Sequence, residues 1–204
     1  MSGEDNLAEE YREAQRENRR RLEELIETGG MEGIMAILKR NGYELDDVEA
    51  SQFTPEETNM DGYLERAVTK AEEDIEFCVQ QSHKPITEIG PGNSRSERPP
   101  REEELDDINR SLAGAAENWS RVRAARGRFA EGDSEPAREY VRQLQDSGFD
   151  YLSHLMRRKF GSKIFSGGSG SKIPFDDDDA EDILTCARAC LERRRLLEEP
   201  REKE

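Results

Sequence analysis

The fold of this chain is decided by residues 105–129, which read LDDINRSLAGAAENWSRVRAARGRF. Spacings of three and four residues alternate along one helical face, which consists of Leu105, Ile108, Leu112, Ala115, Trp119, Val122, Arg126 and Phe129. This is the heptad repeat of a coiled coil or a long bundle helix. Trp119 is large for a two-stranded seam and Arg126 is charged, and a bundle helix with several neighbours tolerates both better. The stripe predicts a long helix whose apolar side packs against other protein, because packing removes that side from water.

A second apolar stretch follows. Gly132, Ser134 and Pro136 form a helix restart signal, and Gly148 is expected to interrupt the helix that begins there. Beyond this glycine lies the most hydrophobic part of the chain. Together with the heptad stripe it gives a predicted protein interface of Leu105, Ile108, Leu112, Trp119, Val122, Phe129, Phe149, Leu152, Leu155 and Met156.

The first 81 residues predict three helices. Residues 6–27 form a long helix with a narrow apolar stripe, which Gly29-Gly30 ends, and residues 31–40 form a short helix with a wide apolar face. Thr54-Pro55 is a helix start signal for a third helix that extends to about Gln81, with Val79 among its core-facing residues. These helices are expected to form a small antiparallel bundle.

The composition of residues 82–101 changes, because proline, glycine and serine replace the apolar periodicity. This stretch predicts a flexible linker and a domain boundary. We therefore expect an all-α protein: a helical bundle of two helical modules, residues 1–81 and 102–165, joined by that linker. Residues 166–171 read SGGSGS, a flexible tract that is either native or engineered. Residues 172–204 predict an acidic C-terminal helix.

Charge limits the classes of partner. The chain has 31 basic and 47 acidic residues, a formal charge of −16, which repels nucleic acid and anionic membranes at long range. Local arginine clusters leave some contact with nucleic acid open. The acidic N-terminus does not resemble a signal peptide, and no apolar run approaches the roughly 20 residues that span a bilayer. We expect a protein of a reducing compartment, cytoplasmic or nuclear, without a membrane partner.

Catalytic and cofactor motifs are not found in the sequence, so we expect no enzyme activity, cofactor or metal. Cys186 and Cys190 lie four residues apart on one helical face, but two ligands do not complete a zinc site, and small buried hydrophobes are the favoured interpretation. The acidic run predicts a solvated helix entrance. It could alternatively dock on arginines, and the two sets are Asp176, Asp177, Asp178 and Asp179 against Arg121, Arg123, Arg126 and Arg128.

These observations favour a non-catalytic scaffold or adaptor, which acts in protein binding and assembly through its amphipathic and heptad helices. Its partners would be other proteins or further copies of the chain. The alternative is a cofactor of a nucleic-acid machine, such as a viral polymerase-associated or chromatin-associated adaptor, with local arginine contacts. An enzyme would need a pocket that the sequence does not indicate.

Overall fold

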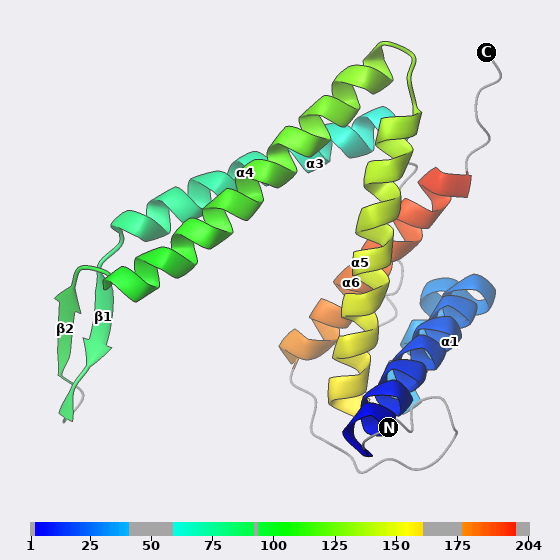
Figure 1. Cartoon of the computed structure of the whole chain (residues 1–204), viewed down its shortest axis with the longest axis horizontal. Coiled ribbons are helices and arrows are strands. Elements are labelled where there is room, and N and C mark those ends of the chain that lie inside the picture. Colours follow the sequence, from blue (N-terminus) through cyan, green and yellow to red (C-terminus); the bar gives the residue numbers. More distant parts are fainter. Residues whose placement is uncertain (1–2, 41–58, 92–93, 161–176, 199–204) are drawn as a thin grey trace. The chain divides into compact units, whose positions relative to one another are not determined.

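The computed structural model describes residues 3–40, 59–91, 94–160 and 177–198. Helices predominate, which confirms the predicted all-α helical bundle (Figure 1). The helices are α1 (Gly3–Arg40), α3 (Met60–His83), α4 (Glu102–Ala130), α5 (Glu135–Phe160) and α6 (Asp177–Glu198), and the strands are β1 (Ile86–Ile89) and β2 (Arg95–Arg98). No helix in the described ranges is both long enough and apolar enough to cross a membrane.

The chain divides into two compact units at other places than the sequence predicts. Unit 1 consists of Met1–Thr58 with Val141–Glu204, and unit 2 of Asn59–Tyr140. The predicted linker, residues 82–101, therefore lies inside unit 2, and α1 and α3 belong to different units. The physical reason is that α4 covers its apolar stripe with α3, so the residues between these two helices form a turn.

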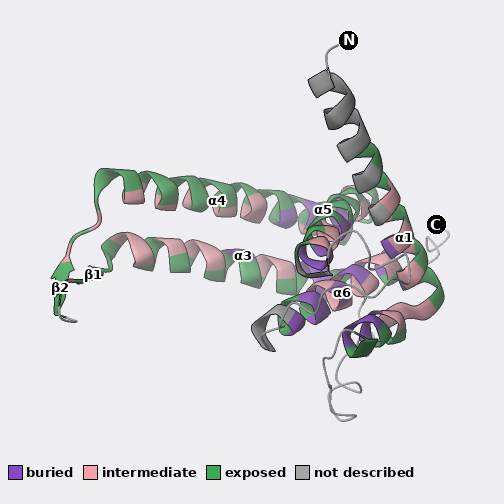
Figure 2. Cartoon of the chain, turned by 90° about the horizontal axis from the view of Figure 1, so that it is seen from below, coloured by how far each residue is buried: buried purple, intermediate pink, exposed green. Residues whose placement is uncertain are grey.

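Unit 2 is an antiparallel helical hairpin of α3 and α4, which lie side by side (Figures 1 and 2). A two-stranded antiparallel ribbon joins them, with Ile86 opposite Arg98. Helix α3 begins at Met60, where the side chain of Asn59 accepts a hydrogen bond of 2.8 Å from the backbone N–H of Gly62. The predicted start signal at residues 54–57 lies outside the described residues.

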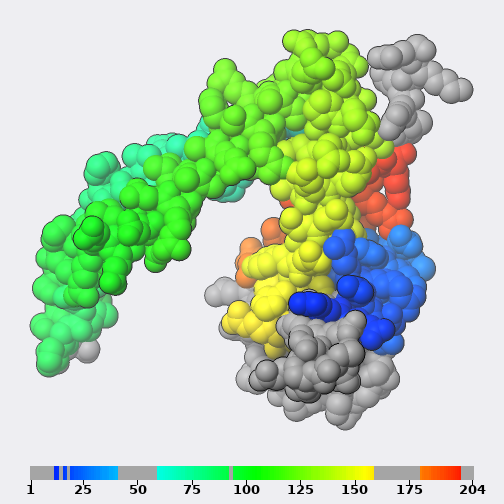
Figure 3. Space-filling model, in the orientation of Figure 1, coloured from blue at the N-terminus to red at the C-terminus, as the bar shows by residue number. Residues whose placement is uncertain are grey.

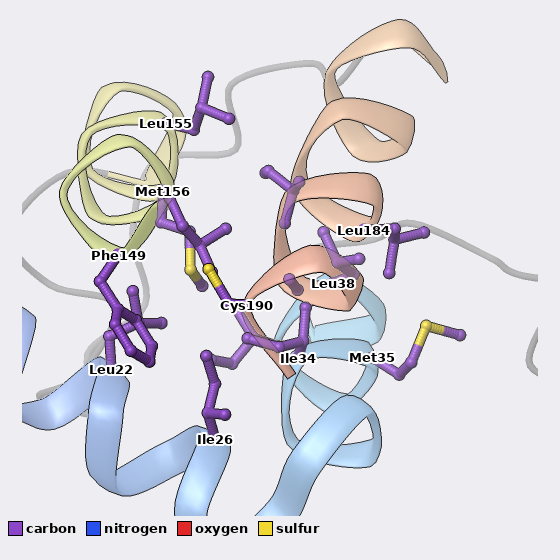
Figure 4. Close-up of a cluster of buried hydrophobic side chains, with 14 residues drawn as sticks. Leu22, Ile26, Ile34, Met35, Leu38, Phe149, Leu155, Met156, Leu184 and Cys190 are labelled. Atoms are coloured by element: carbon purple, nitrogen blue, oxygen red, sulfur yellow. The ribbon is translucent and has the colours of Figure 1, made fainter. Parts of the chain in front are cut away.

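Unit 1 packs α1, α6 and the part of α5 that begins at Val141 around one apolar core, while the first turns of α5 belong to unit 2. Helix α1 changes direction at Gly30, whose φ of 52° lies in the left-handed region that favours glycine, and this confirms the predicted end of the first helix. Side chains from the three helices converge (Figure 4). The fully buried members include Leu22, Ile34, Leu38, Leu152, Ile183, Ala187 and Cys190.

Ion pairs join α1 to α5 beside this core. Arg19 lies 2.6 Å from Asp146 and 3.1 Å from Asp150, and it also contacts Glu23 one turn along its own helix at 2.8 Å. The surfaces of α1 (blue) and α5 (yellow) adjoin in the space-filling view (Figure 3). Unit 1 therefore combines a closed apolar core with ion pairs between helices.

Gly148 does not interrupt α5, contrary to the prediction, because the helix continues through it to Phe160. A Cβ atom at this position would lie 2.8 Å from Nη1 of Arg193 and 3.0 Å from Sγ of Cys190. The same Arg193 nitrogen donates a hydrogen bond of 3.0 Å to the carbonyl of Leu144. The absence of a side chain thus allows α5 and α6 to approach closely.

Gly148→Ala should destabilise unit 1 by about 1–2 kcal/mol, because the added methyl group must displace Cys190 or Arg193. Gly114→Ala in α4 is the matched control. No atom lies within 4 Å of its ideal Cβ, so it should stabilise the protein by about 0.5–1 kcal/mol. Urea unfolding followed by circular dichroism measures both, and equal effects would contradict the close approach of the two helices.

Candidate protein-interaction surfaces

The heptad stripe of α4 faces α3. Val122 is fully buried and Ala125 nearly so, whereas Leu105, Ile108, Leu112, Trp119 and Phe129 are half-buried. On the other side of the seam, α3 contributes buried residues such as Leu64 and Ala71. Within the described ranges, α3 covers the stripe from one side, and Tyr140 of α5 donates a hydrogen bond of 3.1 Å to Asn118 of α4. Val79, which we predicted to face the core, is 42% exposed, whereas the adjacent Cys78 is half-buried.

Four residues of the predicted interface serve a different purpose. Phe149, Leu152, Leu155 and Met156 lie in the core of unit 1, and Leu152 and Met156 are almost completely buried there. Their apolar face on α5 is occupied by α1 and α6 (Figure 4). This corrects the prediction that they contact other proteins. Periodicity identified an apolar face, but the elements that cover it are distant in the sequence.

The part of the hairpin next to the ribbon is poorly buried. We call residues 72–120 the distal segment, and none of its described residues, 72–91 and 94–120, is buried (Figure 2). Phe77 is 60% exposed on α3, and Ile89 is 70% exposed on β1. The buried seam residues of unit 2 all lie closer to its other end. The distal segment therefore carries an apolar stripe without a complete cover.

The distal segment is also strongly acidic. It contains 12 acidic and 5 basic residues, while the rest of unit 2 contains 6 acidic and 7 basic residues. Five of these acids have no hydrogen-bond or ion-pair partner among the described residues, namely Glu97, Glu102, Glu103, Asp106 and Glu117. The positive end of the α4 dipole accounts for Glu102 and Glu103, but not for Glu97 or Glu117.

An ion-pair network holds the ribbon against the start of α4. Arg98 of β2 lies 2.6 Å from Glu88 of β1 and 2.7 Å from Glu104 of α4, and Arg101 lies 3.0 Å from Glu88. The backbone N–H of Arg101 donates to Glu104 at 2.6 Å. The hydrogen bond from Arg98, with that of Arg101, lowers the pKa of Glu104 to about 2. This network was not predicted from the sequence, because residues 82–101 have no apolar periodicity and were expected to form a linker.

Acid should weaken the attachment of the ribbon. Because the pKa of Glu104 is lower in the folded state than its ordinary value of 4.5, its ionised form contributes stability above about pH 4.5. This contribution decreases as the pH falls towards about 2. Glu104→Gln should therefore destabilise the protein more at pH 6 than at pH 3, as measured by urea unfolding. Glu102→Gln, in the same turn but without an ion pair in the described chain, is the control. An equal loss at both pH values would contradict the network.

The predicted arginine set has partners within unit 2. Arg126 lies 3.5 Å from both Asp61 and Glu65 of α3, and Arg128 lies 2.7 Å from Asp133. The guanidinium of Arg123 stacks over the ring of Trp119 at 4.9 Å from its centroid. Docking of the acidic run on these arginines stays a prediction, because Asp176 and the side chains of residues 177–179 lie outside the described part.

The thiol pair on α6 belongs to the core of unit 1. Cys190 is completely buried, and its hydrogen bond with Cys186 and its burial raise its pKa. The same hydrogen bond lowers the pKa of Cys186, whose Sγ lies 3.5 Å from the carbonyl oxygen of Gly148. Within the described ranges, no three histidine, cysteine or acidic residues gather as metal ligands would. The geometry is that of side chains packed between helices.

Alkylation should distinguish the three thiols. Cys190 should react with iodoacetamide most slowly, because it is buried and its raised pKa leaves little of the reactive thiolate. Half-buried Cys78 and Cys186 should react earlier. Peptide mass spectrometry of timed samples measures the three rates. In denaturant the rates should converge, and rapid reaction of Cys190 in the native protein would contradict its burial.

Unit 1 also contains a pocket of about 240 Å³. It is lined by Glu23, Glu27, Gln145, Phe149, Arg194, Leu197 and Glu198. Arg194 lies 2.7 Å from Glu198 and 3.9 Å from Glu27, so its charge is balanced within the pocket. Its lining contains no serine, cysteine or histidine, and the groups there that could act as a general base are the carboxylates of Glu23, Glu27 and Glu198.

Comparison of the chain with protein-family models, curated proteins and solved structures found no match. The distal segment combines an incompletely covered apolar stripe with acids that have no partner among the described residues.

Proposed function

We propose that this chain is a non-catalytic assembly protein, an adaptor that binds another protein through the distal segment of the α3–α4 hairpin. One observation carries the proposal: no described residue between Ala71 and Val122 is buried, although five of the eight residues of the heptad stripe lie there. Two helices cover each other on one side only. A third protein surface would complete the burial of Leu105, Ile108 and Leu112.

Hydrophobic burial supplies the free energy of such an association. Each Å² of apolar surface that leaves water contributes roughly 25 cal/mol. The half-buried seam residues still expose apolar surface that a partner could bury. Exposed Phe77 adds to it, since aromatic side chains are enriched at interfaces. Unit 1, by contrast, has a closed apolar core of its own.

The alternative, a cofactor with direct arginine contacts to nucleic acid, has less support. Arg126 and Arg128 contact acidic residues of the same unit, and the distal segment repels phosphate. Binding to RNA that persists at moderate salt concentration would support this alternative. We therefore assign the hairpin to a protein partner.

Leu112→Asp tests the proposed role of the seam. A charge on this half-buried position should either dissociate the assembly or destabilise unit 2 by about 1–3 kcal/mol. Ala113→Asp introduces the same charge at the adjacent exposed position and should have little effect. Light scattering measures the mass and differential scanning calorimetry the melting temperature. If Leu112→Asp changes neither, the seam has no such role and the proposal fails.

A further inference from the structure

We infer that the partner of the distal segment is a basic amphipathic helix of another protein, which lies along α3 and α4 as a third helix. The inference rests on the proposed function and specifies the chemistry of the partner. Two properties of the segment define that chemistry: its excess of acidic over basic residues, with five carboxylates that have no partner among the described residues, and its incompletely covered apolar seam.

The negative charge of the distal segment favours a basic partner. The distal segment has 12 acidic residues against 5 basic ones, and Arg98, Arg101 and Arg110 are already paired with Glu88, Glu104 and Asp107. Glu97, Asp106 and Glu117 are unpaired in the described chain and lie outside the first turn of α4. Lysine or arginine side chains at the edge of a contact would pair with them and set its orientation.

The same charge argues against a second copy. Each chain carries a formal charge of −16, so two distal segments that meet would bring like charges together. The arginines at the other end of the hairpin are not a ready complement, because Arg126 and Arg128 have acidic partners of their own. Self-association is therefore an outcome to be measured rather than the expected one.

The seam selects a helix. Its half-buried residues recur with helical spacing, and they are Ile75 and Cys78 on α3 and Leu105, Ile108, Leu112 and Ala115 on α4. A third helix can insert its own apolar stripe between two such rows, as in helix recognition by a helical surface. The distal part of α4, residues 102–120, spans about 28 Å at 1.5 Å per residue. A partner helix of about 18 residues matches this length.

The experiment uses the full chain and a synthetic helical peptide of about 18 residues. The peptide has leucine at heptad positions, lysine on both flanks, and neither tryptophan nor cysteine. Trp119, the one tryptophan of the chain, reports binding by a change in fluorescence. Alkylation maps the site, because Cys78 lies in the distal segment and Cys186 in unit 1. Binding should slow the reaction of Cys78 severalfold and leave that of Cys186 unchanged.

Two charge-reversal variants distinguish binding at this site from non-specific electrostatic attraction. The triple variant Glu97→Lys, Asp106→Lys and Glu117→Lys should weaken peptide binding about tenfold or more. The control variant Glu13→Lys, Glu32→Lys and Glu181→Lys makes the same change in net charge at exposed positions of unit 1, and should have a much smaller effect. Circular dichroism checks that both variants stay folded. A scrambled peptide of the same composition should bind weakly.

Each other result overturns the inference. Absence of peptide binding would exclude a basic helix, and equal weakening by both triple variants, or unchanged reactivity of Cys78, would show attraction without a site. Sedimentation of the chain alone separates this inference from the proposed function. If the chain self-associates and Cys78 becomes protected, the hairpin is an assembly surface whose occupant is a second copy. If Leu112→Asp has no effect, the proposed function itself fails.

Discussion

The contact between α3 and α4 is the constraint on which the rest of unit 2 depends. An apolar stripe on a helix must be covered, and α4 finds its cover in the preceding helix of the same chain. This pairing makes the intervening residues a turn, places Arg98 and Arg101 close enough to Glu88 to form ion pairs with it, and assigns α3 to unit 2. It also leaves one side of the seam open, because two helices can shield only part of each other's surface.

The two units differ in how far their charged side chains are paired and their apolar side chains are covered. Unit 1 surrounds a core built from three helices, and Arg19 and Arg194 contact acids of neighbouring helices. Unit 2 has fewer buried side chains, and its acids gather where burial is least. The apolar core of unit 1 is therefore covered within the unit, whereas unit 2 leaves part of its apolar seam incompletely covered. This asymmetry makes the hairpin the part of the molecule best suited to meet another protein.

Local patterns predicted much of the fold. The break at Gly30, the heptad face of α4 and the burial of Cys190 on α6 follow from neighbouring residues, so the sequence indicated each. The pairing of the faces was not predictable in this way. Periodicity shows that Phe149 and Leu152 need a cover, but not that α1 and α6 provide it. The role of Gly148 likewise depends on Cys190 and Arg193, more than 40 residues away.

The ribbon was missed for a related reason. Its strands have four residues each, and the second, Arg95–Arg98, contains no apolar side chain. Ion pairs from Arg98 and Arg101 to Glu88 and Glu104 hold it in place, and pairing of this kind has no periodic signature. Of the candidate site, the stripe on α4 was predictable, whereas the acid-rich, poorly buried distal segment emerged only from the pairing with α3.

The order of the units along the chain has a consequence for folding. Unit 2 is continuous, whereas unit 1 is made of two segments that flank it. The hairpin returns the chain to its starting end, as the contact between Asp61 and Arg126 shows. Once formed, it shortens the effective loop that unit 1 must close and so lowers the entropic cost of joining α1 to α5 and α6. Its helices are close in sequence, which favours fast formation. The hairpin that we propose as a binding surface can thus also assist the folding of unit 1.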